Sequence, residues 1–164
     1  HEVRERVRAL RNSLQVEVGF HAHNNLSLAV ANTLAAIEEG ATRIDGSVRC
    51  LGAGAGNTQT EALIAVLNRL GIDVGIDLYK IMDLAEEVVG PILPGSQEIR
   101  KGSLAMGYAG VYSSFLLHAE RAAKRFNLDS RDILLELGKR KAVGGQEDMI
   151  LDVAAELAQR KVEM

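Results

Sequence analysis

The feature that most constrains the fold is the spacing of apolar residues in the first half of the chain. This spacing changes from every second residue to every third or fourth residue and back again. Residues 15–23 alternate apolar and polar side chains, which predicts a strand. Residues 26–39 have the spacing of an amphipathic helix that ends at Gly40. A second strand is predicted at residues 42–48 and a second helix at residues 58–70. This order with short connections predicts βα units on a parallel sheet, and therefore an α/β fold.

A parallel sheet of two strands is not stable alone, because each parallel strand needs neighbours and a cover on both faces. The remaining strands are therefore expected from another chain or from a preceding segment. The sequence starts at His1 without methionine and already in a helical pattern, in which Val3, Val7 and Leu10 recur at three- and four-residue spacing. We expect this chain to be the C-terminal part of a longer protein.

The second half of the sequence contains only helical patterns. They are predicted at residues 77–89, 103–125, 129–139 and 145–160. Both prolines, Pro91 and Pro94, interrupt this series between the first and second of the four patterns. The sequence therefore predicts two domains, an α/β domain at residues 1–90 and a helical domain at residues 91–164.

Composition and charge exclude two classes of partner. The 164 residues have a net charge of −3, and the 19 basic residues are spread along the chain, so nucleic acid is not expected as a partner. No apolar run approaches the roughly 20 residues needed to cross a bilayer, so a membrane is not expected either. The single cysteine, Cys50, is compatible with a reducing compartment, and we expect a cytoplasmic protein.

Two histidines at the end of the first predicted strand are candidate metal ligands. His21 and His23 are two residues apart, so their side chains lie on one side of the strand, with Cα atoms about 6.6 Å apart. Such a pair can bind one divalent ion, although two structural histidines near a strand end are an alternative. Ligand sites in parallel α/β folds lie at the carboxyl ends of strands, which favours the metal interpretation.

Two further polar residues are candidates for the same site. Asn57 follows the second predicted strand and could supply an oxygen ligand, but it could equally be the N-cap of the helix predicted at residues 58–70. Asp45 has a suitable carboxylate, but its position within a strand also fits an internal hydrogen-bond network. The ligand types alone do not choose between zinc, manganese, iron and cobalt.

The segment "GAGAGN", residues 52–57, resembles a phosphate-binding loop only superficially. Its glycines do not have the G-x-G-x-x-G spacing of dinucleotide-binding loops, and no Lys-Ser/Thr of a P-loop follows. We therefore predict a tight turn at the edge of an active site rather than a nucleotide site.

The helix predicted at residues 103–125 carries several polar aromatic residues. Tyr108 is predicted to be a core residue with its hydroxyl at the edge, and Phe115, Leu116 and Leu117 are predicted core residues. The segment "VGGQEDMI", residues 143–150, predicts a double-glycine turn followed by an acidic first helical turn, which the helix dipole alone explains.

Four motifs together resemble one enzyme family over nearly the whole chain. They are "GFHAHNNLSLAVAN", "RIDGSVRCLGAGAGNTQTEALIAVL", "GYAGVYSSFLLHAERAA" and "VGGQEDMI". The sequence resembles the C-terminal half of the 4-hydroxy-2-oxovalerate aldolases, which share their barrel with hydroxymethylglutaryl-CoA lyase. The resemblance implies the last βα units of a TIM (β/α)8 barrel followed by an all-helical C-terminal domain.

The resemblance also implies an activity, a metal and partners. The family consists of class II aldolases that use a divalent metal, preferably Mn²⁺, to cleave 4-hydroxy-2-oxovalerate, a small 2-oxoacid, to pyruvate and acetaldehyde. This step belongs to the meta-cleavage catabolism of aromatic compounds. The helical domain docks on an acylating acetaldehyde dehydrogenase, which receives the aldehyde through a channel.

Individual positions match the functional residues of that family. His21 and His23 match its metal-binding histidines, and His21 also matches a residue beside the substrate. Tyr112 matches the catalytic, substrate-binding tyrosine of the helical domain, and Asn57 matches a metal ligand of the lyase relatives. The arginine, aspartate ligand and general-base histidine of the first barrel strand have no match, so we expect little activity without the N-terminal half of the barrel.

Two rival functions remain open from the sequence. The first is a non-catalytic docking module, in which residues 77–164 bind a partner protein; intact His21, His23 and Tyr112 argue against it. The second is another lyase or synthase of the same barrel group that acts on a CoA ester. Cleavage of 4-hydroxy-2-oxovalerate without CoA would exclude it.

Overall fold

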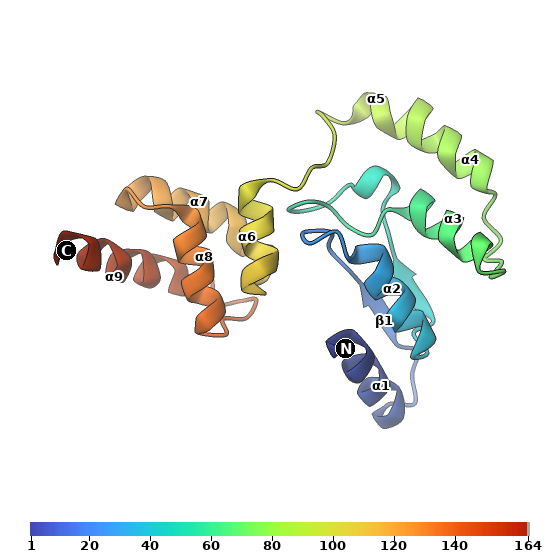
Figure 1. The fold of residues 1–164 in the computed structure, drawn as a ribbon, viewed down its shortest axis with the longest axis horizontal. Helices are drawn as coiled ribbons and strands as arrows, with labels where there is room; N and C mark the ends of the chain where they lie inside the picture. Colours follow the sequence, from blue (N-terminus) through green and yellow to red (C-terminus); the bar gives the residue numbers. More distant parts are fainter. Residues whose placement is uncertain (164) are drawn as a thin grey trace. The chain divides into compact units, whose positions relative to one another are not determined.

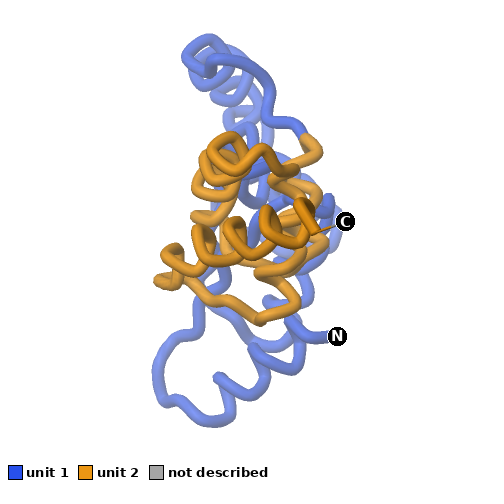
Figure 2. The backbone as a smooth tube through the Cα atoms, turned by 90° about the vertical axis from the view of Figure 1, so that its left-hand side faces the viewer, with its two compact units in different colours: residues 1–98 blue, residues 99–164 orange. Residues whose placement is uncertain are grey.

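The computed structural model describes residues 1–163, which form two compact units that meet between Glu98 and Ile99 (Figure 2). The predicted division at residue 90 precedes this boundary. Gly90–Ile92 forms a helical turn, α5, that directly continues the preceding helix, and Pro91 lies at its start. Extended backbone begins only at Leu93.

The first unit contains the predicted strands and helices in the predicted order (Figure 1). Its first six elements are α1 (Glu2–Ser13), β1 (Gly19–His21), α2 (Ala29–Glu38), β2 (Arg43–Asp45), the 3-10 turn η1 (Val48–Cys50) and α3 (Thr60–Arg69). The two strands pair in parallel, with Phe20 opposite Ile44. The prediction of parallel βα units is therefore confirmed, and both strands end on the same side of the sheet.

Both strands are shorter than predicted. Of the apolar residues of the alternating segment, Val18 is 5% exposed, whereas Val16 is 61% exposed and lies before the ladder starts. The reason is that the β2 segment paired with β1 has only three residues, so residues outside it have no partner strand in the part of the chain that the structure describes. A small core joins α1, α2 and the strands; its members are Val3, Val7, Val18, Phe20, Ala36, Ala41 and Ile44.

The helix predicted at residues 77–89 is present in two geometries. It consists of α4 (Leu78–Asp83), which runs into the π-helical segment η2 (Leu84–Val89). Asp77 begins α4 as its N-cap, since its side chain accepts a hydrogen bond from the Lys80 N–H at 3.0 Å. This segment packs against α3 and against η1.

The second unit is entirely helical. It contains α6 (Lys101–Ala109), α7 (Phe115–Phe126), α8 (Ser130–Lys139) and α9 (Met149–Glu163). These helices bury one continuous core, because each contributes an apolar stripe to it. Its fully buried members are Met106, Phe115, Ala119, Ile133, Leu134, Leu137, Val153 and Ala154.

The prediction of one helix over residues 103–125 is wrong. α6 ends at Gly110, whose φ of 68° is left-handed, and the Val111 N–H donates to the Met106 carbonyl at 3.3 Å, as in a glycine-terminated helix end. The prediction that Tyr108 is a core residue is also wrong, since it is 78% exposed on the last turn of α6. Phe115 is a core residue, as predicted, whereas Leu117 is 62% exposed.

No helix within residues 1–163 combines the length and the apolar character required to span a membrane.

Candidate functional site

The two histidines lie at the carboxyl end of the parallel strand pair. His21 is the last residue of β1 and is opposite Asp45, the last residue of β2. Its Nδ1 atom lies 3.5 Å from Oδ2 of Asp45, and both side chains are open to solvent. The His21 and His23 rings are 5.0 Å apart between centroids, at 78° to each other. Both imidazoles therefore lie on the side of the strand where the sequence placed them.

His23 and Asn57 lie opposite each other across an isolated antiparallel bridge. His23 Nδ1 and Asn57 Oδ1 are both buried, and neither has a hydrogen-bond partner among the described residues. Buried polar atoms are rarely left without a hydrogen bond. Two neighbouring residues that each have such an unpaired nitrogen or oxygen atom therefore fit a bound cation, which these atoms could coordinate through their lone pairs. The alternative that Asn57 is a helix N-cap is wrong, because Gln59 holds that position and the Asn57 side chain donates to the Leu51 carbonyl at 3.0 Å.

The surroundings of His23 favour its neutral form. Burial lowers the pKa of His23, and the adjacent His21 lowers this pKa further. A neutral imidazole is the form that binds a metal, because a protonated ring has no free lone pair. The neutral ring is thus the favoured form of His23.

The glycine-rich segment forms the tight turn that the sequence predicted. Gly56 has a φ of +90°, and a Cβ atom at this position would lie 1.8 Å from the Cys50 carbonyl oxygen. Gly52 gives room to the Asn57 side chain, since a Cβ atom at Gly52 would lie 2.5 Å from Asn57 Oδ1. The glycines thus allow the loop backbone to close on itself and the Asn57 amide to fit within it.

Three hydrogen bonds attach this loop to the segment that carries the histidines. The Asn24 N–H donates to the Gly56 carbonyl at 2.7 Å, and the Thr58 N–H donates to the Ala22 carbonyl at 3.0 Å. The Asn25 side chain accepts the Ala55 N–H at 2.9 Å. Sequence reasoning missed Asn24 and Asn25, although two consecutive asparagines directly after a strand are a signal for side chains that bind backbone groups.

In the second unit, Tyr112 lies in the connection between α6 and α7. It is 58% exposed, and its ring packs against the double-glycine turn, where a Cβ atom on Gly144 would lie 3.0 Å from Tyr112 Cδ1. Two residues on, the Ser114 hydroxyl donates to Glu147 Oε1 at 2.6 Å. The segments "GYAGVYSSFLLHA" and "GGQEDMI" are therefore in direct contact. Glu147 has a hydrogen-bond partner, so the helix dipole is not the only explanation for an acidic residue at this position.

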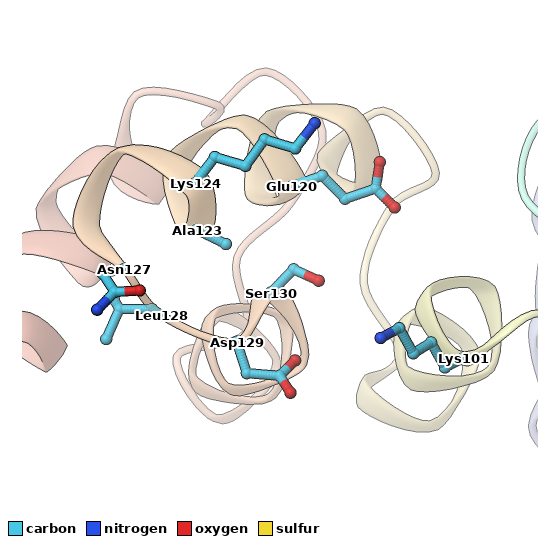
Figure 3. A pocket seen from close by; sticks show the side chains of 8 residues that line it. All are labelled: Lys101, Glu120, Ala123, Lys124, Asn127, Leu128, Asp129 and Ser130. Carbon is cyan, nitrogen blue, oxygen red and sulfur yellow. The ribbon is translucent and has the colours of Figure 1, made fainter.

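One cavity of the second unit lies away from Tyr112. It has a volume of about 720 Å³ and lies between α6, α7 and the start of α8 (Figure 3). Figure 3 shows Lys101 and Lys124 on its wall together with Glu120 and Asp129. Because positive and negative side chains alternate around it, its charge selects no ligand class.

No group of three or more histidine, cysteine, aspartate or glutamate side chains within residues 1–163 is arranged to hold a metal ion. The possible donors on this side of the first unit are two imidazoles with ring centroids 5.0 Å apart and the amide of Asn57, whose backbone is bridged to that of His23. Nitrogen donors with an amide oxygen suit first-row divalent ions, and such a set leaves positions open for further ligands. The residues present therefore fit a divalent metal.

Two protein families match different parts of the chain. The HMGL-like family matches residues 1–88, and the DmpG-like communication domain matches residues 97–159. The two matches correspond closely to the two compact units. The crystal structure of the N-terminal domain of a protein from Bacteroides vulgatus, assigned as an aldolase, superposes with a TM-score of 0.57 at 28% identity, over 71% of this chain and 38% of that one.

Curated relatives align with nearly all of the sequence. Proteins named 4-hydroxy-2-oxovalerate aldolase are 79% identical in Bacillus thuringiensis, over 100% of this chain and 48% of that protein. Those of Geobacillus thermodenitrificans and Moorella thermoacetica are 76% and 61% identical, each over 98% of this chain and 47% of the relative. The chain thus spans about half the length of the curated relatives that it matches.

Proposed function

Because the chain belongs to the HMGL-like family, we propose that it forms part of a divalent-metal-dependent aldolase that cleaves 4-hydroxy-2-oxovalerate to pyruvate and acetaldehyde. The observation that carries this proposal is the position of His21 and His23 at and just after the carboxyl end of β1, with Asn57 bridged to His23 and an unpaired buried atom on each of His23 and Asn57. Ligand sites of parallel α/β sheets lie at this edge. The names of the relatives support the substrate.

His21, His23 and Asn57 would hold the metal, for which we propose Mn²⁺. A bound divalent cation supplies Lewis-acid polarisation of the 2-oxo group in such a cleavage. Burial favours the neutral form of His23, which is the form that can bind a metal. His21 is half exposed, which leaves its ring accessible to a substrate beside the metal.

Tyr112 is the residue of the helical unit that we propose to contact the substrate. Its ring is fixed against Gly144, which limits its freedom, while its exposure leaves the side chain accessible. A phenol held in this way can donate a hydrogen bond to a substrate oxygen.

The proposed enzyme also needs further strands. We propose that β1 and β2 are part of a TIM (β/α)8 barrel that is completed by polypeptide beyond these residues, which also supplies the general base for the 4-hydroxyl proton. The parallel ladder and the similarity to the Bacteroides vulgatus structure support the barrel. The length of the curated relatives, about twice that of the aligned segment, supports the additional polypeptide.

The helical unit is proposed to dock on an acylating acetaldehyde dehydrogenase that consumes the aldehyde. The match to the DmpG-like communication domain supports this partner. Two large apolar side chains one turn apart on α6, Leu104 and Tyr108, are 48% and 78% exposed and offer an apolar surface for such a contact. The place of the reaction in aromatic catabolism, channelling of the aldehyde and a cytoplasmic location remain predictions.

The proposal can be tested by co-expressing this chain with the first half of the Bacillus thuringiensis relative. The purified assembly is assayed for pyruvate release from 4-hydroxy-2-oxovalerate with Mn²⁺ and without CoA. We expect metal-dependent pyruvate release, and an assembly that stays inactive with every first-row divalent metal would reject the aldolase function. Activity that appears only with a CoA ester would favour the rival lyase or synthase.

Two variants assign the residues within this assay. His23→Ala should weaken Mn²⁺ binding by more than about tenfold, because one of few ligands is removed. Tyr112→Phe should lower turnover and leave both the melting temperature and Mn²⁺ affinity unchanged. Wild-type Mn²⁺ affinity of His23→Ala, measured by calorimetry, would reject the ligand role, and wild-type turnover of Tyr112→Phe would reject the catalytic role.

A further inference from the structure

We propose that Glu61 is a positioning residue that fixes the amide of Asn57 beside His23 by anchoring the backbone of Arg49 and Cys50. The inference rests on the proposed function for the role of Asn57. Glu61 lies in the first turn of α3, and its carboxylate accepts the Arg49 N–H with both oxygens, at 3.0 and 3.2 Å. A carboxylate that binds a backbone N–H in this way forms a charge-assisted hydrogen bond, which is stronger than a neutral one.

The anchored segment has an unfavourable backbone conformation. Arg49 and Cys50 are consecutive residues with left-handed φ values of 54° and 59°, and neither is glycine. Such a conformation is unfavourable for a residue with a side chain and persists only where its surroundings hold it. The contact from Glu61 to the Arg49 N–H supplies such a restraint at the first of the two residues.

The second half of the connection leads from Cys50 to Asn57. The Cys50 carbonyl accepts the Asn57 N–H at 3.1 Å, and the next carbonyl, of Leu51, accepts the Asn57 side-chain Nδ2 at 3.0 Å. These two contacts orient the side-chain amide and leave Oδ1 unpaired. The directions of the Cys50 and Leu51 carbonyls thus determine where the Asn57 oxygen lies.

Two neighbouring residues, Gln59 and Glu86, show how the contact of Glu61 with the Arg49 backbone differs from an ordinary ion pair. Gln59 Nε2 donates to Glu61 Oε1 at 2.7 Å, which fixes the carboxylate. Glu86 binds the same Arg49, but through the guanidinium, at 2.9 Å. Glu86 therefore offers a matched control, since its loss removes a charge near Arg49 and leaves the backbone anchor in place.

Glu61 could instead act only as an acidic residue that stabilises the N-terminus of α3. Glu61→Gln distinguishes the two roles, because glutamine keeps an oxygen acceptor and loses the charge. Positioning predicts that Glu61→Gln retains the wild-type loop and that Glu61→Ala does not. A dipole effect alone predicts that both variants behave alike.

The test measures hydrogen exchange and side-chain NMR signals of the chain in the assembly co-expressed with the first half of the Bacillus thuringiensis relative, without metal, followed by a Mn²⁺ titration. In Glu61→Ala, we expect protection of the Asn57 N–H to fall about tenfold, while amides of α2 keep their protection. Glu61→Gln and Glu86→Gln should both stay within about threefold of the wild type. Mn²⁺ affinity should follow the same order across the three variants.

Unchanged Asn57 protection in Glu61→Ala, or equal losses in Glu61→Ala and Glu61→Gln, would overturn the proposal. If Glu61→Ala does not fold, Glu61→Asp replaces it, because aspartate keeps the charge and is one methylene too short for the contact. Failure of the wild type to bind Mn²⁺ would reject the proposed metal site, whereas the exchange data would still decide whether Glu61 positions Asn57.

Discussion

The hydroxyl groups of Thr33 and Thr58 lie 3.0 Å apart, and both residues are completely buried. Thr33 lies in α2, and Thr58 follows the glycine-rich loop. The Thr33 hydroxyl donates to the Ala29 carbonyl at 2.8 Å, so the Thr58 hydroxyl must be the donor to Thr33. This contact fixes the loop to α2 at the residue next to Asn57.

The direction of these hydrogen bonds predicts unequal effects of two similar substitutions. Thr33→Val leaves the buried Thr58 hydroxyl without an acceptor and should lower the free energy of unfolding by about 1–3 kcal/mol. Thr58→Val should cost less, because Thr33 keeps its bond to Ala29. Urea denaturation of both single variants and the double variant checks this prediction, and a larger loss in Thr58→Val would contradict the assigned donor.

Gly56 and Gly71 provide a matched pair of left-handed glycines. A Cβ atom on Gly56 would lie 1.8 Å from the Cys50 carbonyl oxygen, whereas one on Gly71 would meet nothing within 4 Å. Gly71→Ala should therefore lower the free energy of unfolding by only about 1 kcal/mol, which is the cost of a left-handed backbone conformation for a residue with a Cβ atom. Gly56→Ala should cost more than about 3 kcal/mol, because the loop must also move. Similar melting temperatures of the two variants would contradict this prediction, because they would show that the glycine-rich loop moves away from the new Cβ atom without loss of stability.

Asp129 gives the second unit a defined dependence on pH. It is the N-cap of α8 and accepts the Arg131 N–H at 2.9 Å, and hydrogen bonds from Arg131 lower the pKa of Asp129 to about 2. Because the folded-state pKa is below the unfolded one, the stabilisation is complete above about pH 4 and is lost as the pH falls toward 2.

Two variants separate the charge of Asp129 from its capping role. Asp129→Ala should lower stability at neutral pH by about 1 kcal/mol. Asp129→Asn keeps a capping oxygen, so it should retain most of the stability and lose this part of the pH dependence. Thermal unfolding of each variant between pH 2 and 5 provides the comparison, and an unchanged pH profile of Asp129→Asn would exclude the proposed titration.

The hydrogen bond from Ser114 to Glu147 predicts that removal of the Ser114 hydroxyl changes the pKa of the Glu147 carboxyl group. The Ser114 hydroxyl is the main cause that lowers the pKa of Glu147. Ser114→Ala should therefore raise this pKa toward the usual range for glutamate, which carbon-13 NMR of the Glu147 carboxyl can follow. Ser113→Ala is the control, since no side-chain hydrogen bond of Ser113 occurs in the described structure. Equal Glu147 pKa values in both variants would assign the shift to the backbone instead.

The order of elements and the face that carries the histidines could be predicted from the sequence. The period-two run placed Val18 inward and His21 and His23 on the opposite side, because alternation depends only on the geometry of a strand. The lengths of the strands could not be predicted, since they depend on how many residues the neighbouring strand pairs. The break at Gly110 was missed because apolar residues on both sides keep a helical spacing across it.

The contacts that hold the candidate site were largely invisible in the sequence. The sequence does not single out Glu61, an acidic residue in the first turn of α3, and only the structure brings it to the Arg49 N–H. For Asn57, the sequence left open a role as helix N-cap. In the structure its side chain instead donates a hydrogen bond to the Leu51 carbonyl. Such contacts depend on left-handed residues such as Cys50, which local patterns do not indicate.

The three-residue ladder has a consequence for how the site is acquired during folding. The three hydrogen bonds that attach the glycine-rich loop to the histidine segment join residues 30 to 36 positions apart, such as Asn25 with Ala55. Contacts of this range form slowly because a long loop must close first. Few ladder bonds are available to guide that closure. We therefore expect the proposed metal ligands to come together only after α2 and both strands are in place, so that ion binding would report on completed folding rather than assist its first steps.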